Sequence, residues 1–193
     1  MNKSYLILIL TLIFFIESKA QTILKLNTTL YNGRKQAVEC KEGTVASTTT
    51  DDILLSATLS SNQTFYNGKN APVYCFKEFP VIFNVRGDLV SGTLASTQKF
   101  YNGKNVEVHC LEHTQVSFFD SGRLESAILS EGKTYYNGRN AEVHCVNNRR
   151  IVFYENGTVQ SAFLSVPQTF FNSKMWQSNL IKAVWCILVS WGM

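Results

Sequence analysis

Short apolar stretches alternate with polar turn residues along most of the chain, and the pattern recurs every 35 residues. Three copies of its most regular part read FYNGKNAPVYC, FYNGKNVEVHC and YYNGRNAEVHC, and a looser copy reads LYNGRKQAVEC. These copies end at Cys75, Cys110, Cys145 and Cys40, respectively. A self-match at a fixed interval of about 20 to 50 residues indicates a repeat architecture.

Each repeat predicts four short β-strands and leaves no room for a helix. From Val106 to Cys110, small apolar residues alternate with Glu107 and His109. Successive side chains of a strand point to opposite faces of its sheet. This stretch therefore predicts a strand with an apolar inner face and a polar outer face.

Two of the following stretches predict departures from a regular strand. Glycine recurs in the turn after the Val-x-Phe strand, as Gly87, Gly122 and Gly157, which predicts positive φ there. The next strand carries two large apolar residues five positions apart, such as Leu124 and Leu129, which a regular strand would place on opposite faces. We therefore expect a β-bulge or a bend that returns the second residue to the core.

An aromatic pair followed by Asn-Gly precedes each Val-x-Val-x-Cys strand. Asn-Gly between two strands is the strongest short-range signal for a two-residue type I′ hairpin, so these two strands are predicted to pair antiparallel. The residues expected to have structural roles in the hairpins are Tyr31, Tyr66, Tyr101 and Tyr136, Gly33, Gly68, Gly103 and Gly138, and Cys40, Cys75, Cys110 and Cys145.

The pattern weakens at both ends of a predicted repeat domain that spans residues 21–174, with units starting near 31, 66, 101 and 136. The first unit has EGTVASTTTDD between Cys40 and Ile53 and lacks the Val-x-Phe strand, as a capping unit can. A fifth unit is truncated after Lys174, and residues 175–193 form an apolar, tryptophan-rich tail. The tail either covers the end of the sheet or touches a membrane, or it replaces a repeat that a shifted reading frame interrupted.

The predicted fold class is all-β: tandem 35-residue repeats that form an extended antiparallel meander sheet, with a β-solenoid or a closed barrel as alternatives. In a solenoid, equivalent cysteines would lie roughly 4.8 Å apart and could form disulfides. In a meander with four strands per repeat, they would lie on the order of 19 Å apart. The turn signals require adjacent antiparallel strands, which favours the meander and four buried, unpaired thiols.

The first twenty residues have the three parts of a secretory signal peptide: Lys3, an apolar run from Tyr5 to Ile16, and the small-residue segment Ser18-Lys19-Ala20. The apolar run is shorter than the roughly 20 residues that span a bilayer. Cleavage after Ala20 would leave residues 21–193 as the mature chain. We therefore expect a secreted protein, or one of the periplasm or cell envelope.

Charge narrows the choice of partner. Residues 1–20 hold two of the 18 basic and one of the 14 acidic side chains, which leaves 16 and 13, too even a balance for a nucleic-acid partner. A basic residue follows every Asn-Gly turn, and these residues suit either solvated turns or a ladder that contacts a linear partner. The partners that fit are an anionic glycan, a lipid surface or another protein. The candidate ladder is Arg34, Lys69, Lys104 and Arg139.

No catalytic, metal or cofactor site is predicted. His109 and Cys110 are neighbours in one strand, so they face opposite sides of the sheet and cannot share a metal ion. Gly-x-Ser-x-Gly and phosphate-loop motifs are absent, and a serine repeated in every unit, such as Ser126, suits a structural role. The prediction is a non-enzymatic binding or scaffold module. The alternatives are an envelope component held at a membrane by its tail and a hydrolase with a site between repeats.

The run of an aromatic strand, a glycine turn and Leu-x-Ser-Ala/Gly-x-Leu resembles the MORN-variant repeats of exported bacterial proteins. The lines that carry the resemblance are FFDSGRLESAIL, from Phe118 to Leu129, and FYENGTVQSAFL, from Phe153 to Leu164. The resemblance implies an elongated antiparallel sheet of hairpins and, for function, a binding or scaffolding role.

Overall fold

A computed structural model describes residues 20–168 and 185–187, and this part consists of β-strands and turns without helices. Ten strands form one antiparallel sheet whose spatial order follows the chain, and β1 and β18 at its two ends do not pair with each other. The strands of this long sheet are β1 (Ala20–Ile23), β4 (Val45–Thr48), β5 (Leu54–Thr58), β8 (Pro80–Phe83), β9 (Leu89–Thr93), β12 (Gln115–Phe118), β13 (Leu124–Ile128), β16 (Arg150–Phe153), β17 (Val159–Phe163) and β18 (Trp185–Ile187). The predicted all-β fold with an extended meander sheet is confirmed.

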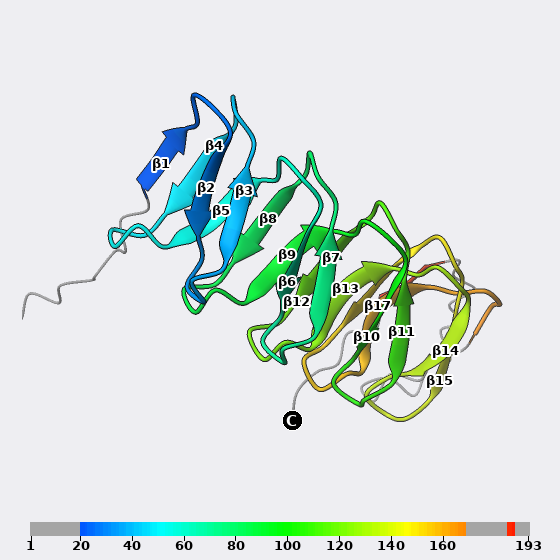
Figure 1. Cartoon of the computed structure of the whole chain (residues 1–193). Coiled ribbons are helices and arrows are strands. Elements are labelled where there is room, and N and C mark those ends of the chain that lie inside the picture. The colour runs from blue at the N-terminus through cyan, green and yellow to red at the C-terminus, as the bar shows by residue number, and fades with distance from the viewer. Residues whose placement is uncertain (1–19, 169–184, 188–193) are drawn as a thin grey trace, which may run out of the picture.

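The remaining strands form four separate two-stranded hairpins, which lie one after another over one face of the long sheet (Figure 1). The hairpins are β2 (Thr28–Tyr31) with β3 (Ala37–Cys40), β6 (Gln63–Tyr66) with β7 (Pro72–Cys75), β10 (Gln98–Tyr101) with β11 (Glu107–Cys110), and β14 (Lys133–Tyr136) with β15 (Glu142–Cys145). Each repeat thus contributes two strands to the sheet and two to the layer above it.

The core lies between the two layers. Phe65 of a hairpin packs edge-to-face on Phe83 of the sheet with ring centroids 5.0 Å apart, and the next two repeats form the same aromatic pair. Val38 and Leu54, from hairpin and sheet, are fully buried in the same cluster. Because burial of apolar area is the main favourable term in folding, each hairpin stabilises the part of the sheet that it covers.

The two-layer arrangement differs from a meander in which all four strands of a repeat lie side by side. Equivalent residues are separated by two sheet strands, about 9.6 Å, and not by four strands. This spacing still exceeds the Cα separation of a disulfide, which is below about 7 Å. The prediction of buried, unpaired thiols is confirmed for Cys40, Cys75, Cys110 and Cys145.

The predicted details of the sheet strands are also confirmed. The register shifts at the start of β5, β9, β13 and β17, which is the expected bulge, and both large residues of such a strand, as Leu54 and Leu59, are buried. Gly87, Gly122 and Gly157 have φ of +82°, +75° and +83°. In all four hairpins the valine and cysteine of the second strand are buried and the residues between them are more exposed.

The prediction of a two-residue type I′ turn at Asn-Gly was wrong. In the second hairpin, the N–H of Asn67 donates to Ala71 O and the N–H of Asn70 donates to Asn67 O, which closes a three-residue loop. The residue with positive φ is Asn70, at +58°, and neither Asn67 nor Gly68 has it. A type I turn followed by one left-handed residue is the usual form of such a loop.

The ends of the repeat domain differ from the expectation in one respect. The first unit lacks the Val-x-Phe pattern but still forms the corresponding strand, β4. In this strand Ala46 takes the buried position that Val81 has in β8. At the other end, β18 pairs with β17 in the register that β16 has with β13. The predicted signal peptide, apart from Ala20, and the rest of the tail lie outside the described residues.

Candidate functional site

The Asn-Gly turns hold each hairpin to the sheet of the next repeat. The Nδ2 of Asn67 donates to the main-chain oxygen of Gly122 at 3.0 Å, while its Oδ1 accepts the N–H groups of Lys69 and Ala71. The first and third hairpins make the same contact. A Cβ on Gly68 would lie 2.5 Å from Asp120 O, so no side chain fits there. The asparagine and glycine of the motif therefore have a structural explanation.

The first member of the basic ladder is occupied by an ion pair. The Nε of Arg34 donates to Asp88 Oδ1 at 2.8 Å, and Arg86 donates to the other carboxylate oxygen at 3.0 Å. The Asp88 side chain is only 7% exposed. Burial acts to raise the pKa of Asp88, but hydrogen bonds from Arg34, Arg86 and Asn84 outweigh it and hold the pKa below its ordinary value. The charge of Arg34 is thus partly balanced within the protein, since Arg34 and Arg86 share the one negative charge of Asp88.

The other basic residues lie at the tips of the following hairpins. Lys104 Nζ donates to Asn140 Oδ1 of the next hairpin at 2.8 Å, a contact to a neutral group that leaves its charge unbalanced. Lys69 has neither an ion pair nor a side-chain hydrogen bond within residues 20–168. Arg139 occupies the same place in the fourth turn. The structure therefore brings the four residues to one edge of the hairpin layer, where they differ in available charge.

The tyrosines next to this edge form a row on the outer face of the hairpin layer, here called the tyrosine row. Each is the last residue of the first hairpin strand, and in each the preceding residue points into the core. Their exposed fractions are 57%, 41%, 53% and 39%, and their hydroxyls have no hydrogen-bond partner in the described part of the chain. The row consists of Tyr31, Tyr66, Tyr101 and Tyr136.

No hydrogen bond of the side chain, ion pair or ring contact within residues 20–168 explains why tyrosine recurs at this half-exposed position. The residues directly opposite in the hairpin vary from repeat to repeat: Ala37, Pro72, Glu107 and Glu142. Exposed positions of a strand usually tolerate many residues, and the repeats of this chain do vary at the other outer positions. Sequence analysis grouped the tyrosines with the structural residues. The alternation with a buried neighbour was the signal that they point outward.

The thiols lie on the opposite side of the hairpins from the tyrosine row and do not contribute to it. Burial raises the pKa of Cys75 and of Cys110 to about 12, and that of Cys40 to about 11. Thiolates are the reactive form of cysteine, so these side chains are chemically inert in the folded protein. Their role is to fill the core.

His109 joins a small charged cluster on the outer face of the third hairpin. One ring nitrogen contacts Glu107, and Nδ1 lies 3.0 Å from Glu131 Oε1. Hydrogen bonds from His109 and Lys99 hold the pKa of Glu107 below its ordinary value. Residues 20–168 contain no group of three or more His, Cys, Asp or Glu side chains placed to hold a metal ion. The cluster ties neighbouring loops together.

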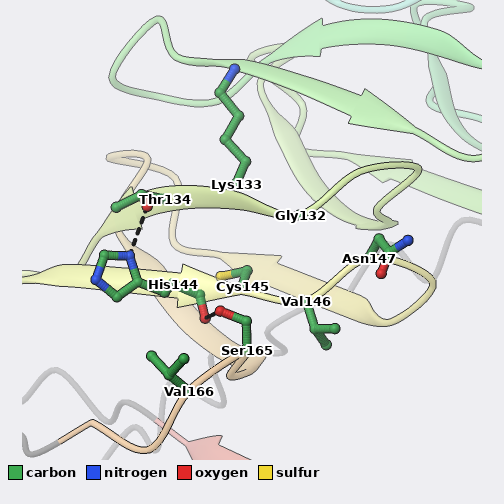
Figure 2. Close-up of a pocket in the computed structure, with 9 residues that line it drawn as sticks. All are labelled: Gly132, Lys133, Thr134, His144, Cys145, Val146, Asn147, Ser165 and Val166. Carbon is green, nitrogen blue, oxygen red and sulfur yellow. Dashed lines mark hydrogen bonds between the residues drawn. The ribbon is translucent and has the colours of Figure 1, made fainter.

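A pocket of about 590 Å³ lies beside the fourth hairpin (Figure 2). Thr134 Oγ1 lies 2.8 Å from His144 Nδ1, and His144 Nε2 lies 3.7 Å from Glu142 Oε2. A hydroxyl, an imidazole and a carboxylate in line are the parts of an activated nucleophile. Here, however, the distance from the imidazole to the carboxylate is longer than a hydrogen bond allows. Ser165 Oγ donates to the main-chain oxygen of His144 and not to its ring. The pocket is lined by Gly132, Lys133, Thr134, His144, Cys145, Val146, Asn147, Ser165 and Val166.

The equivalent positions in the third hairpin indicate that this arrangement is not a repeated catalytic site. In the third hairpin, Lys99 stands where Thr134 stands in the fourth, so the hydroxyl is missing beside His109. The tyrosine row, by contrast, is present in all four hairpins. It is therefore the outer-surface feature for which the structure offers the best case as a functional site.

Comparison with known proteins adds no relative: no family model, no curated protein and no solved structure matches this chain. Residues 20–168 and 185–187 contain no helix with the length and apolar character to cross a membrane.

Proposed function

We propose that this protein is an exported, non-enzymatic binding module that presents the same surface to an extended partner once per repeat. The observation that carries the proposal is the tyrosine row: four exposed aromatic side chains at equivalent positions, held in register by one continuous sheet. Aromatic residues supply much of the binding energy at protein surfaces because they bury a large area with few rotatable bonds.

The signal-peptide pattern of residues 1–20 and the resemblance to MORN-variant repeats support an exported role. Expression of the whole chain with its native N-terminus, followed by N-terminal sequencing, tests this part. We expect the mature chain to begin at Gln21 and to be recovered outside the cytoplasm. A chain that keeps Met1 and stays in the cytoplasm would contradict export.

A one-repeat deletion tests whether the surface acts once per repeat. Removal of residues 100–134 joins Lys99 to Tyr135 and takes out one 35-residue period, including Tyr101 and Lys104. Binding is measured against immobilised acidic polysaccharide, neutral polysaccharide, vesicles rich in phosphatidylglycerol, and proline-rich peptide. We expect one of these polymers or surfaces to bind the full chain, and the deletion to weaken binding because one contact of the series is lost.

Two controls accompany the deletion. Circular dichroism checks that the shortened chain keeps its β-structure, and the length of each recovered polymer is compared before and after incubation. Binding that is identical with and without the deleted repeat contradicts a repeated surface. Shortening of a polymer, lost in a Thr134→Ala variant, would instead identify the Thr134–His144 pair as a hydrolytic site.

A further inference from the structure

We infer that the tyrosine row and the lysines beside it bind a linear acidic polysaccharide, with sugar rings stacked on the tyrosines and carboxylate or sulfate groups against Lys69 and Lys104. This inference rests on the proposed function, because it names the partner of the same repeated surface.

The row fits a partner that is itself regular. Neighbouring tyrosines are related by one repeat, which advances by two sheet strands, about 9.6 Å. Adjacent strands also rotate by roughly 20 to 25°, so each repeat turns by about 40 to 50° from the last. A flat membrane can touch only one or two units of such a winding row, whereas a flexible chain can follow it. A polysaccharide offers the same chemical group at every step.

A peptide in the β conformation fits the spacing poorly. Side chains on one face of a β-strand recur every 6.4 to 6.8 Å or so, which does not match a step of about 9.6 Å. A polyproline II peptide repeats about every 9.3 Å and does match the step, but a proline-rich chain has no negative charge to meet Lys69 and Lys104.

Tyrosine is suited to the two sides of a sugar ring. Its aromatic face packs on the apolar C–H face of a pyranose, and its hydroxyl can bond the ring's hydroxyl rim. In the row these hydroxyls have no protein partner within the described residues, so a ligand can bond them without displacing an internal contact. Ala37 and Pro72, opposite Tyr31 and Tyr66 in their hairpins, are small beside the rings, which are 57% and 41% exposed.

The charges beside the row select an acidic polymer. Lys69 and Lys104 follow Tyr66 and Tyr101 by three residues, and neither forms an ion pair within residues 20–168. Two acidic residues lie opposite tyrosines of the row: Glu107, opposite Tyr101, is paired with Lys99 at 3.3 Å, and the exposed Glu142, opposite Tyr136, lies 3.7 Å from His144 Nε2. A polyanion therefore meets unbalanced positive charge along the turn edge and a locally neutralised carboxylate beside Tyr101.

The test measures the affinity of the secreted chain for short and long polygalacturonate oligomers by isothermal titration calorimetry. The paired variant Tyr66→Ala/Tyr101→Ala should lose about tenfold in affinity per tyrosine, and Lys69→Glu/Lys104→Glu about fivefold per charge with a weaker salt dependence. Tyr74→Ala and Lys77→Glu are matched controls, because these residues are exposed but lie off the row and off the turn edge. Both controls should bind as the wild type does.

The outcomes separate this inference from the proposed function. Affinity that rises with oligomer length and falls only in the row variants supports both. Tight binding to neutral cello-oligosaccharide, polyuridylate or proline-rich peptide in place of polygalacturonate overturns the inference and leaves the repeated surface standing. Binding to polygalacturonate that the row variants keep and the controls lose overturns the assignment to this face. Absence of binding to every polymer and vesicle overturns both.

Discussion

At the residue scale, Gly68 and Gly122 face each other where a hairpin meets the sheet, and both sites lack room for a Cβ, which at Gly122 would lie 2.2 Å from Lys69 N; Gly122 has a second constraint as well. Gly122 has φ of +75°, a conformation that side chains with a Cβ disfavour. Gly68 has no positive φ, but an added Cβ would lie 2.5 Å from Asp120 O. The first reason is readable from a turn motif in the sequence. The second depends on a contact between repeats.

Replacement of Gly103 by alanine should therefore destabilise the protein although its φ permits a side chain. The new Cβ would lie 2.2 Å from Glu155 O, and the hairpin would have to lift from the sheet. We expect a loss of at least about 2 kcal/mol in the free energy of unfolding, measured by urea denaturation. Gly132→Ala is the control, because its Cβ would lie 3.2 Å from the nearest atom, Cys145 O. Equal losses in the two variants would contradict the close-contact explanation.

The Asp88 carboxylate gives stability a dependence on pH. Its folded-state pKa lies below the unfolded value of about 3.9, so its contribution is present above that value and is lost as pH falls through the folded pKa. Asp88→Asn should cost roughly 1–3 kcal/mol at neutral pH, because Arg34 and Arg86 lose a charged acceptor. The difference from wild type should shrink below about pH 4. A difference that stays constant down to pH 2 or so would contradict this.

At the scale of elements, each hairpin is attached to the sheet by main-chain hydrogen bonds and by side chains, and to the next hairpin by side chains. The main-chain contact is a β-bridge between the hairpin cysteine and the leucine that follows a sheet strand, as between Cys75 and Leu94. Asparagine Nδ2 groups bond the sheet turns of the next repeat, and Gln63 Oε1 accepts the N–H of Glu39 in the preceding hairpin. Gln98 Oε1 does the same for Tyr74. Neighbouring hairpins form separate two-stranded sheets with no backbone ladder between them, so these glutamine side chains join the second strand of one hairpin to the first strand of the next.

The substitution Asn67→Asp tests the attachment of a hairpin. Oδ1 can still close the loop, but an oxygen replaces the donor that faces Gly122 O. We expect a loss of about 1–3 kcal/mol in the free energy of unfolding and faster amide hydrogen exchange in β6 and β7 than in β8. Asn62→Asp serves as the control, because Asn62 is exposed, its Oδ1 still accepts from Lys77 N, and the lost Nδ2 donor makes only an exposed contact of 3.4 Å to Tyr74 OH. A similar loss of stability in both variants would show that the hydrogen bond from Asn67 to Gly122 does not have the proposed role.

Elements were predictable where the signal was local. Alternation placed Val108 and Cys110 inside, and the spacing of Leu124 and Leu129 predicted the bulge. The layer to which a strand belongs was not predictable, because strands of the hairpins and of the sheet alternate in the same way. The type of the Asn-Gly turn was predicted wrongly for a related reason. Its glycine is required by a close contact with the next repeat and not by a positive φ of its own.

At the scale of the molecule, each repeat contacts mainly the repeats before and after it, so stability is a sum over units and their interfaces. The tyrosine row emerges only at this scale. The recurrence of tyrosine was visible in the sequence, but its meaning required the burial of Phe65 and Phe100 beside it. The basic ladder was also visible in the sequence. The ion pair of Arg34 was not, because its partner Asp88 lies 54 residues further along the chain.

The chain without residues 100–134 tests this additivity by stability as well as by binding. The urea m-value should fall by roughly a quarter, since one of four units no longer exposes its surface on unfolding. The transition should remain cooperative, because the new junction joins two equivalent positions. An m-value equal to that of the full chain would mean that the removed unit was not folded in the native protein.

If the protein is exported, as proposed above, the buried thiols bear on when it must fold. Once the two layers have closed over Cys40, Cys75, Cys110 and Cys145, the spacing of the repeats prevents disulfides and burial excludes oxidants. In an oxidising compartment the four thiols are therefore at risk only between translocation and folding. Folding competes with oxidation in that interval. A variant that folds slowly should accumulate mispaired disulfides even when its native state is as stable as that of the wild type.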